Sequence, residues 1–207
     1  MTSLDSSPPL SLPWILLAFV CGSLPFSVWL PKLIRREDVR RYGDGNPGAT
    51  NAFRVGGAGV GLAALLLDVS KAAAPVGWAY FQAGITGWPM LLIATAPVLG
   101  HAFSPFLRFR GGKALAVAFG VWIGLTLWKL SLPALLLVLF WRRVIDVDGW
   151  AVMLALAVLL GIILLWMPAP LFVGVVIGQF IILGVKHLND LRQRPHLRPW
   201  LTRRFSH

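Results

Sequence analysis

The run from Trp150 to Met167 reads Trp-Ala-Val-Met-Leu-Ala-Leu-Ala-Val-Leu-Leu-Gly-Ile-Ile-Leu-Leu-Trp-Met and contains no charged residue. A helix needs about 20 predominantly apolar residues to cross the hydrocarbon core of a bilayer, so this run predicts a membrane span. Similar runs recur along the whole chain. We expect about seven spans, at residues 10–33, 60–82, 88–103, 114–130, 132–144, 150–167 and 171–185. The fifth run is short and starts around Ser131-Leu-Pro133, which predicts a hairpin or one broken pair with the fourth.

Composition agrees with this pattern. The chain has 207 residues, of which 57% are hydrophobic and only 13% are charged, and its mean hydropathy is +0.74. Such values are far from those of a soluble domain, and the brief loops leave no room for one. We therefore expect one all-α, polytopic integral membrane domain over residues 1–207. Cys21 is the only cysteine, so it forms no intrachain disulfide and is interpreted as a packing residue in the first span.

The distribution of positive charge predicts the orientation. The first residues carry Asp5 and no Lys or Arg, unlike the basic start of a signal peptide, which favours a retained helix with its N-terminus outside. Seven spans then leave the C-terminus in the cytoplasm, and 17 of the 19 basic residues fall on cytoplasmic segments, as the positive-inside rule requires. A basic face over anionic lipid headgroups accounts for the net charge of +11 without any nucleic acid partner.

A short polar stretch, Phe106-Leu-Arg-Phe-Arg-Gly-Gly-Lys113, lies between the third and fourth predicted spans. Adjacent glycines can turn backbone N–H groups toward an anion, and Lys113 adds a positive charge, so Gly111, Gly112 and Lys113 are predicted to bind a substrate phosphate. His101 precedes this stretch at the end of the third span. A histidine in that place is either a hydrogen-bonding packing residue or a ligand of the same site.

The loop Tyr42-Gly-Asp-Gly-Asn-Pro-Gly-Ala-Thr-Asn-Ala-Phe-Arg54 is the second polar stretch. Its glycines permit turns, its Asn and Thr side chains offer hydrogen bonds, and its arginine can bind a phosphate with two N–H groups. We interpret it as a binding loop rather than a plain connection between helices. The candidate residues are Asp44, Asn46, Thr50, Asn51 and Arg54.

Two further places carry polar residues near the membrane. Asp68 and Lys71 are spaced i, i+3 on one helix face, which predicts an ion pair that is either structural or part of the site. Asn189 and Arg192 share a face after the last span, where they either bind substrate or belong to a basic helix end at the membrane surface.

These motifs resemble a known family. Gly22-Ser-Leu-Pro25, Gly45-Asn-Pro-Gly-Ala-Thr-Asn51 with Arg54, Leu66-Leu-Asp-Val-Ser-Lys71 and Gly100-His-Ala-Phe-Ser-Pro-Phe-Leu-Arg-Phe-Arg-Gly-Gly-Lys113 are similar to those of the bacterial acyl-phosphate:glycerol-3-phosphate acyltransferases, the PlsY family. The resemblance implies a seven-helix enzyme of the bacterial inner membrane. It implies transfer of an acyl chain from acyl phosphate to the 1-hydroxyl of glycerol 3-phosphate, giving lysophosphatidic acid, with no cofactor or metal.

Acyl phosphate is already activated, so this reaction needs positioning and charge stabilisation rather than a nucleophilic residue. We predict Asp44, Asn46 and Lys113 as catalytic residues. The predicted substrate-binding residues are Thr50, Asn51, Arg54, Lys71, His101, Gly111, Gly112, Asn189 and Arg192. A non-catalytic membrane protein that binds or moves a phosphorylated ligand is the alternative. Acyl-chain length and oligomeric state stay open.

The chain also departs from the family pattern. Asp44 stands where the family usually has Ser, and a carboxylate there repels phosphate unless a cation lies between them or unless it acts as a base. Lys186 stands at the family's His when Asn189 and Arg192 are aligned, and the usual Glu is missing. The segment from Trp141 to Asp148 stands where the family tends to have Arg followed by serines. These departures indicate a diverged member.

Overall fold

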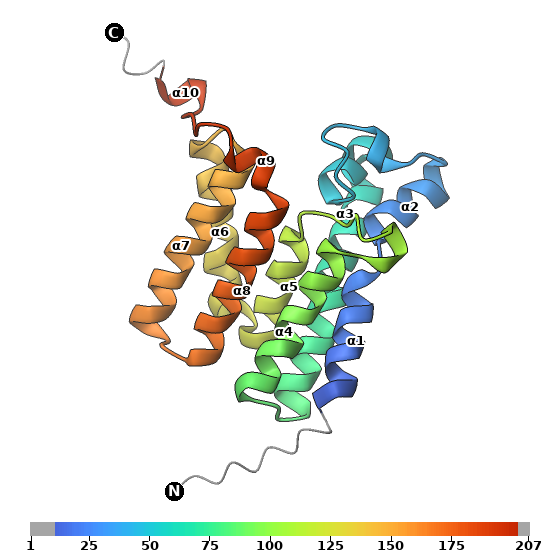
Figure 1. Cartoon of the computed structure of the whole chain (residues 1–207). Helices are drawn as coiled ribbons and strands as arrows, with labels where there is room; N and C mark the ends of the chain where they lie inside the picture. The colour runs from blue at the N-terminus through green and yellow to red at the C-terminus, as the bar shows by residue number, and fades with distance from the viewer. Residues whose placement is uncertain (1–10, 203–207) are drawn as a thin grey trace, which may run out of the picture.

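The computed structural model describes residues 11–202, and its regular elements are almost all α-helices. The long helices lie side by side in one bundle (Figure 1). The helices from the first half of the chain form one side of the bundle and those from the second half form the other. Helix α5 (Leu115–Thr126) joins them, because it packs on α3 (Ala49–Gly77) and on α6 (Trp128–Val144).

The first predicted span is broken in two. Helix α1 (Ser11–Ser23) is followed by α2 (Phe26–Arg35), and Pro25 lies at the N-terminal cap of α2. Proline has no N–H group to donate, so it starts a new helix instead of continuing the old one. Residue 10 and Asp5, on which the retained-helix prediction partly rests, lie outside the described residues. Cys21 lies in α1 as a free, half-buried cysteine, as predicted.

The second predicted span starts earlier than expected. After the short 3-10 helix η2 (Val39–Arg41), α3 begins at Ala49 rather than at residue 60, and it continues into the π-helical turn η3 (Trp78–Gln82). The boundary prediction failed because glycine-rich sequence suggested a loop. The structure instead places a single irregular residue, Gly57 with φ of 75°, inside a helical segment.

The fourth and fifth predicted spans form a broken pair. They correspond to α5 and α6, which meet at Leu127, a residue with φ of 54°. The break lies before the predicted Ser131-Leu-Pro133, and Pro133 is accommodated near the start of α6. Thr126 explains how α6 can begin there, since its hydroxyl oxygen accepts a hydrogen bond from the backbone N–H of Leu130 at 3.2 Å.

Three of the remaining helices follow the predicted runs closely: α4 (Gly87–Ala102), α7 (Asp148–Trp166) and α8 (Pro170–Lys186). Three short elements lie outside the predicted runs: the 3-10 helix η4 (Pro105–Leu107), α9 (Leu188–Leu191) and α10 (Pro199–Thr202). Within the described residues, four helical segments are long and apolar enough to cross a membrane: Ser11–Arg35, Ala49–Gln82, Gly87–Leu107 and Asp148–Trp166. Within the described residues, most of each predicted run is helical, while the count of seven spans stays a prediction.

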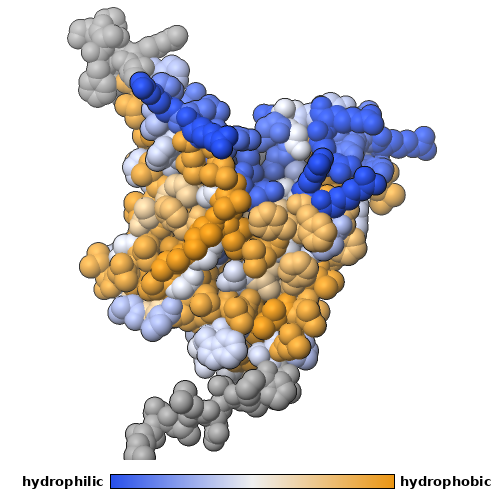
Figure 2. All heavy atoms as spheres, in the orientation of Figure 1, coloured by the Kyte–Doolittle hydropathy of each residue, from blue (hydrophilic) through white to orange (hydrophobic). Residues whose placement is uncertain are grey.

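The surface is divided between an apolar body and a polar end. On the face drawn, Figure 2 shows hydrophobic residues over the body of the bundle and hydrophilic residues gathered at the end that carries α2, the start of α3 and α9. Apolar side chains on the body are strongly exposed; Leu165, for example, is 80% exposed. This is the pattern of a protein whose flanks face lipid. The segments before α3, before α5 and after α8 all reach the polar end, so the predicted site residues are assembled there.

Candidate functional site

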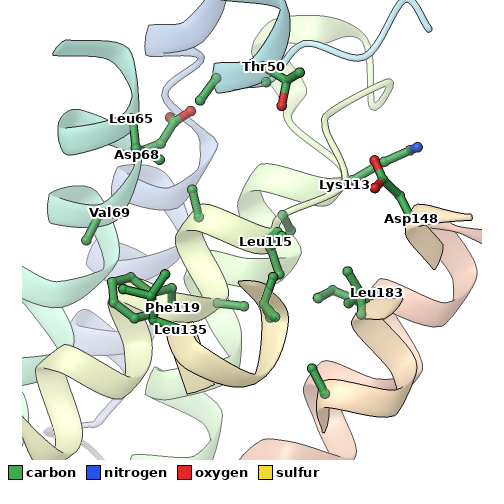
Figure 3. Close-up of a pocket in the computed structure, with 18 of the residues that line it drawn as sticks. Thr50, Leu65, Asp68, Val69, Lys113, Leu115, Phe119, Leu135, Asp148 and Leu183 are labelled. Carbon is green, nitrogen blue, oxygen red and sulfur yellow. The ribbon is translucent and has the colours of Figure 1, made fainter. Parts of the chain in front are cut away.

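A cavity of about 920 Å³ runs from the polar end into the bundle. Figure 3 shows its two parts: Thr50, Lys113 and Asp148 lie at the polar end, and Phe119, Leu135 and Leu183 lie along the apolar walls. The walls come from α3, α5, α6, α7 and α8. Of the predicted site residues, those lining the cavity are Asp44, Asn46, Thr50, Arg54, His101 and Lys113.

The loop before α3 is held by its own side chains. One oxygen of Asp44, Oδ1, accepts hydrogen bonds from the backbone N–H of Asn46 at 3.2 Å and from Nδ2 of Asn51 at 3.0 Å. Asn51 also donates to the carbonyl of Asn46, and its Oδ1 accepts from Arg54 at 3.1 Å. The polar atoms of Asn51 are thus engaged within the protein. The geometry makes it a support for Asp44 and Arg54.

Gly43 shows why this loop needs glycine. Its φ is 58°, and a Cβ atom there would collide with the side chains of Arg54 and Asn51. Glycine adopts this left-handed conformation without the steric cost that other residues incur. The glycine therefore lets Arg54 fold back over the loop and reach the cavity.

Lys113 lies between two carboxylates at the mouth of the cavity. Its Nζ is 3.2 Å from Oδ2 of Asp44 and 3.0 Å from Oδ2 of Asp190, and its backbone N–H donates to Oδ1 of Asn46 at 3.0 Å. These contacts join the loop before α3, the segment before α5 and helix α9. The cation that the sequence required beside Asp44 is therefore present in the fold.

The same contacts set the ionisation of this cluster. Partial burial acts to raise the pKa of Asp44, but hydrogen bonds from the N–H of Asn46 and from Lys113 outweigh it and lower the pKa below its ordinary value. Partial burial acts to lower the pKa of Lys113, but Asp190 and Asp44 outweigh it and raise the pKa. Both groups are charged at neutral pH.

The two glycines before Lys113 allow the chain to pack closely against the end of α4. The N–H of Gly112 donates to the carbonyl of His101 at 3.2 Å, and the carbonyl of Gly111 accepts from Nζ of Lys186 at 2.8 Å. A Cβ atom on Gly111 would collide with that same His101 carbonyl. The expectation that both glycines turn their N–H groups toward an anion is wrong for Gly112, because its N–H is used within the protein.

A second polar cluster is buried beneath the mouth. Nζ of Lys71 donates to Oδ1 of Asp68 at 2.7 Å, lies 2.9 Å from Nδ1 of His101, and donates to the carbonyl of Leu24 at 2.6 Å. Ser27 donates to the other oxygen of Asp68. The predicted Asp68–Lys71 pair is confirmed, and it ties the α1–α2 junction to α3 and α4. The Lys71 ammonium makes its three contacts within this cluster, which favours the structural reading for the lysine, while Asp68 and His101 also line the cavity.

The opposite wall carries polar residues that the sequence did not select. Arg142, at the end of α6, binds both oxygens of Asp148 through Nε at 3.0 Å and Nη2 at 2.9 Å, and both residues line the cavity. Burial lowers the pKa of His187, which lines the cavity beside them. Arg142 could have been found from sequence, since it follows Val138 and Leu139 by one helical turn on the same apolar helix.

The predicted pair after the last span, Asn189 and Arg192, lies away from the cavity. Asn189 and Arg192 are both exposed, and neither lines the cavity. Asp190, between them, points to Lys113 instead. Residues on a single turn of helix face different directions, so the alignment with a family motif selected the correct segment and missed the residue that reaches the site.

Comparison with known proteins gives a consistent result. The family described as glycerol-3-phosphate acyltransferase matches residues 12–194. The chain is similar to glycerol-3-phosphate acyltransferases from Desulfovibrio desulfuricans, with 39% identity over 80% of this chain and 75% of that protein, and from Cronobacter sakazakii, with 46% identity over 51% of each.

Solved structures agree. The fold is similar to a crystal structure of PlsY, an integral membrane glycerol 3-phosphate acyltransferase, in its glycerol 3-phosphate form, with a TM-score of 0.80 and 26% identity over 95% of this chain and 100% of that one. The lysophosphatidic acid form of PlsY gives a TM-score of 0.77 at 25% identity.

Proposed function

The chain belongs to the glycerol-3-phosphate acyltransferase family, and we propose that it moves an acyl chain from acyl phosphate to the 1-hydroxyl of glycerol 3-phosphate. It is a multi-pass membrane protein. The observation that carries the proposal is the cavity itself, which joins an apolar channel to a mouth lined by Arg54, Lys113 and Arg142. This shape suits a lipid-like donor that meets a small phosphorylated acceptor at the membrane surface.

The donor fits the wall formed by α6. Val138 and Leu139 line the apolar channel, and Arg142 follows them by one turn on the same helix face. An acyl chain that lies along these residues brings its phosphate to Arg142. Asp148 takes two of the five N–H donors of the Arg142 guanidinium, and the others serve to bind the phosphate oxygens of the donor.

The acceptor fits the opposite side of the mouth. Arg54 and Lys113 supply positive charge for the phosphate of glycerol 3-phosphate, and Thr50 at the start of α3 offers a hydroxyl group toward the cavity (Figure 3). Lys113 then exchanges its carboxylate partners for phosphate. This exchange frees Oδ2 of Asp44, while Oδ1 stays bound to Asn46 and Asn51.

The freed oxygen of Asp44 acts as a general base. The 1-hydroxyl oxygen attacks the acyl carbonyl carbon, a C–O bond forms, and the hydroxyl proton passes to Asp44. The oxyanion that develops is stabilised by the positive groups of the mouth, and it collapses as the bond to phosphate breaks. Phosphate leaves with the bonding electron pair and takes up the proton from Asp44, which gives lysophosphatidic acid and inorganic phosphate.

The test is product formation by purified protein in lipid, with palmitoyl phosphate and glycerol 3-phosphate as substrates and Lys113→Ala as the variant. We expect lysophosphatidic acid from the wild type and none from the variant. Lys129, at the start of α6 and outside the cavity lining, gives the matched control Lys129→Ala, which keeps its activity. No product from folded wild type that still binds glycerol 3-phosphate would reject acyl phosphate as donor and support a non-catalytic paralogue.

The placement in the cell is part of the same proposal. The single transmembrane domain crosses the bacterial inner membrane seven times, with its N-terminus outside and the site loops in the cytoplasm. Basic residues at the polar end support this orientation. Labelling of a single cysteine introduced at Arg36, in a Cys21→Ala background, tests it. Reaction only from the cytoplasmic side agrees with the proposal, and reaction only from outside contradicts it.

A further inference from the structure

The end of α6 leaves backbone carbonyl groups that no residue of the helix can satisfy. In this structure the C-terminal part of the chain satisfies three of them. The carbonyl of Arg142 accepts from Nε of Arg198 at 2.8 Å, that of Arg143 from Nε1 of Trp200 at 3.1 Å, and that of Val144 from the backbone N–H of Arg198 at 2.9 Å. Arg198 thus supplies two of the three donors.

Residues 193–200, which we call the C-terminal strap, are anchored on both sides of these contacts. The N–H of Asp146 donates to the carbonyl of His196 at 2.9 Å, and Nε1 of Trp150 donates to the carbonyl of Gln193 at 2.9 Å. Arg198 also forms an ion pair with Asp146 at 3.6 Å. The strap therefore binds the end of α6, the start of α7 and the turn between them.

The family match ends at residue 194, so most of the strap lies beyond it. The strap nevertheless acts on a part of the chain that reaches the cavity. Arg142 offers its carbonyl to Arg198 and its guanidinium to Asp148, which lies at the first position of α7. The strap thus binds the backbone of Arg142 directly. It also binds the start of α7, which carries Asp148, the partner of the Arg142 side chain.

We infer that Arg198 is a positioning residue that holds Arg142 at the donor phosphate. The C-terminal strap thereby contributes to the binding of acyl phosphate. The last turn of a helix frays when its carbonyl groups lack partners, and a frayed turn lets the Arg142 guanidinium spread over many positions. Arg198 never touches the substrate in this arrangement. The inference rests on the role proposed above for Arg142 in binding acyl phosphate.

The test is a double-mutant cycle on purified protein in lipid, with KM for palmitoyl phosphate, KM for glycerol 3-phosphate and kcat measured for each variant. Arg198→Ala removes the Nε donor, and we expect it to raise the KM for palmitoyl phosphate roughly three- to tenfold, as the loss of one hydrogen bond allows. The KM for glycerol 3-phosphate stays unchanged. Asp146→Asn is the matched control, because it breaks the ion pair with Arg198 and leaves both bonds from Arg198 to α6 in place.

The second arm of the cycle separates positioning from general support. In the Arg142→Ala background, Arg198→Ala has no further effect on the KM for palmitoyl phosphate, since residues that act as one unit are not additive. Additive effects, or equal rises in both KM values, would overturn the inference even if the protein stays folded. If Arg142→Ala alone leaves the KM for palmitoyl phosphate unchanged, the proposed role of Arg142 is rejected, and the inference with it. Should Arg198→Ala fail to fold, Trp200→Phe removes the bond to the carbonyl of Arg143 and leaves both Arg198 bonds intact, so we expect it to raise the KM for palmitoyl phosphate alone, by less than about threefold. A rise in both KM values, or a larger rise than this, overturns the inference.

Discussion

Lys71 and Lys113 have similar partners and very different surroundings. Each ammonium group lies within 3.0 Å of an aspartate oxygen. The side chain of Lys71 is only 3% exposed and its bonds run to Asp68, His101 and the carbonyl of Leu24, whereas that of Lys113 is 24% exposed and faces the cavity. Whether a lysine–aspartate pair is a structural or a functional element therefore depends on whether a ligand can replace one of the two partners.

The difference follows from desolvation. A buried ion pair cannot exchange its partners for water or substrate without leaving an uncompensated charge, so it stays closed. A half-exposed pair costs little to open, because water solvates both groups as they part. Lys71 therefore holds the α1–α2 junction, α3 and α4 together, while Lys113 can release its carboxylates at little cost, as its proposed role in binding phosphate requires.

The largest expected effect is the loss of stability when the buried Lys71–Asp68 pair is broken. Lys71→Met removes the partner of Asp68 and should lower the free energy of unfolding by about 3–5 kcal/mol. Lys113→Met is the matched variant and should lower it by less than about 1 kcal/mol. Both are measured by denaturation in the same detergent. Equal losses of stability would show that burial does not distinguish the two lysines.

The next effect concerns catalysis at the exposed pair. Asp44→Asn keeps the size of the side chain and removes the proposed base, so kcat should fall roughly a hundredfold or more while stability changes little. Asp38→Asn is the control, because Asp38 pairs with Arg40 and does not line the cavity. A kcat within twofold of wild type for Asp44→Asn would mean that another group takes the proton.

A smaller effect is expected for the second carboxylate. Asp190→Asn removes one negative charge beside Lys113, so the mouth attracts the phosphate of glycerol 3-phosphate more strongly and KM for this substrate should fall roughly two- to fivefold. The difference from wild type should shrink in 0.5 M salt. A rise in KM would show instead that Asp190 is needed to hold Lys113 toward the substrate.

The smallest effect is the pH dependence of stability. The pKa of Asp44 is lowered in the folded protein, so its pairing stabilises the fold above its unfolded pKa of about 3.9 and this contribution is lost as pH falls through the folded pKa. Because Asp44 is half exposed, the loss stays below about 1 kcal/mol. Comparing Tm at pH 7 and pH 3 for wild type and Asp44→Asn checks it. A steeper acid-side decline for the variant contradicts the sign.

Apolar run lengths predicted the helical membrane fold, because the thickness of the hydrocarbon core sets the minimum length of a helix that crosses it. The Gly-rich motifs likewise pointed to the segments that line the mouth, and the spacing of Asp68 and Lys71 predicted their pairing. Local signals failed at helix boundaries: Ala49 begins α3 inside a glycine-rich stretch, and Leu127 separates α5 from α6 without a proline.

Only the tertiary structure decided which charges meet. Asp190 reaches Lys113 from α9, Arg142 pairs with Asp148 across the turn between α6 and α7, and Arg198 caps α6. These contacts join residues that packing brings together from different helices, and no periodicity within one segment encodes them. Hydrophobicity is a property of each run and can be read along the chain. The pairing of charges depends on distances that exist only once the helices are packed.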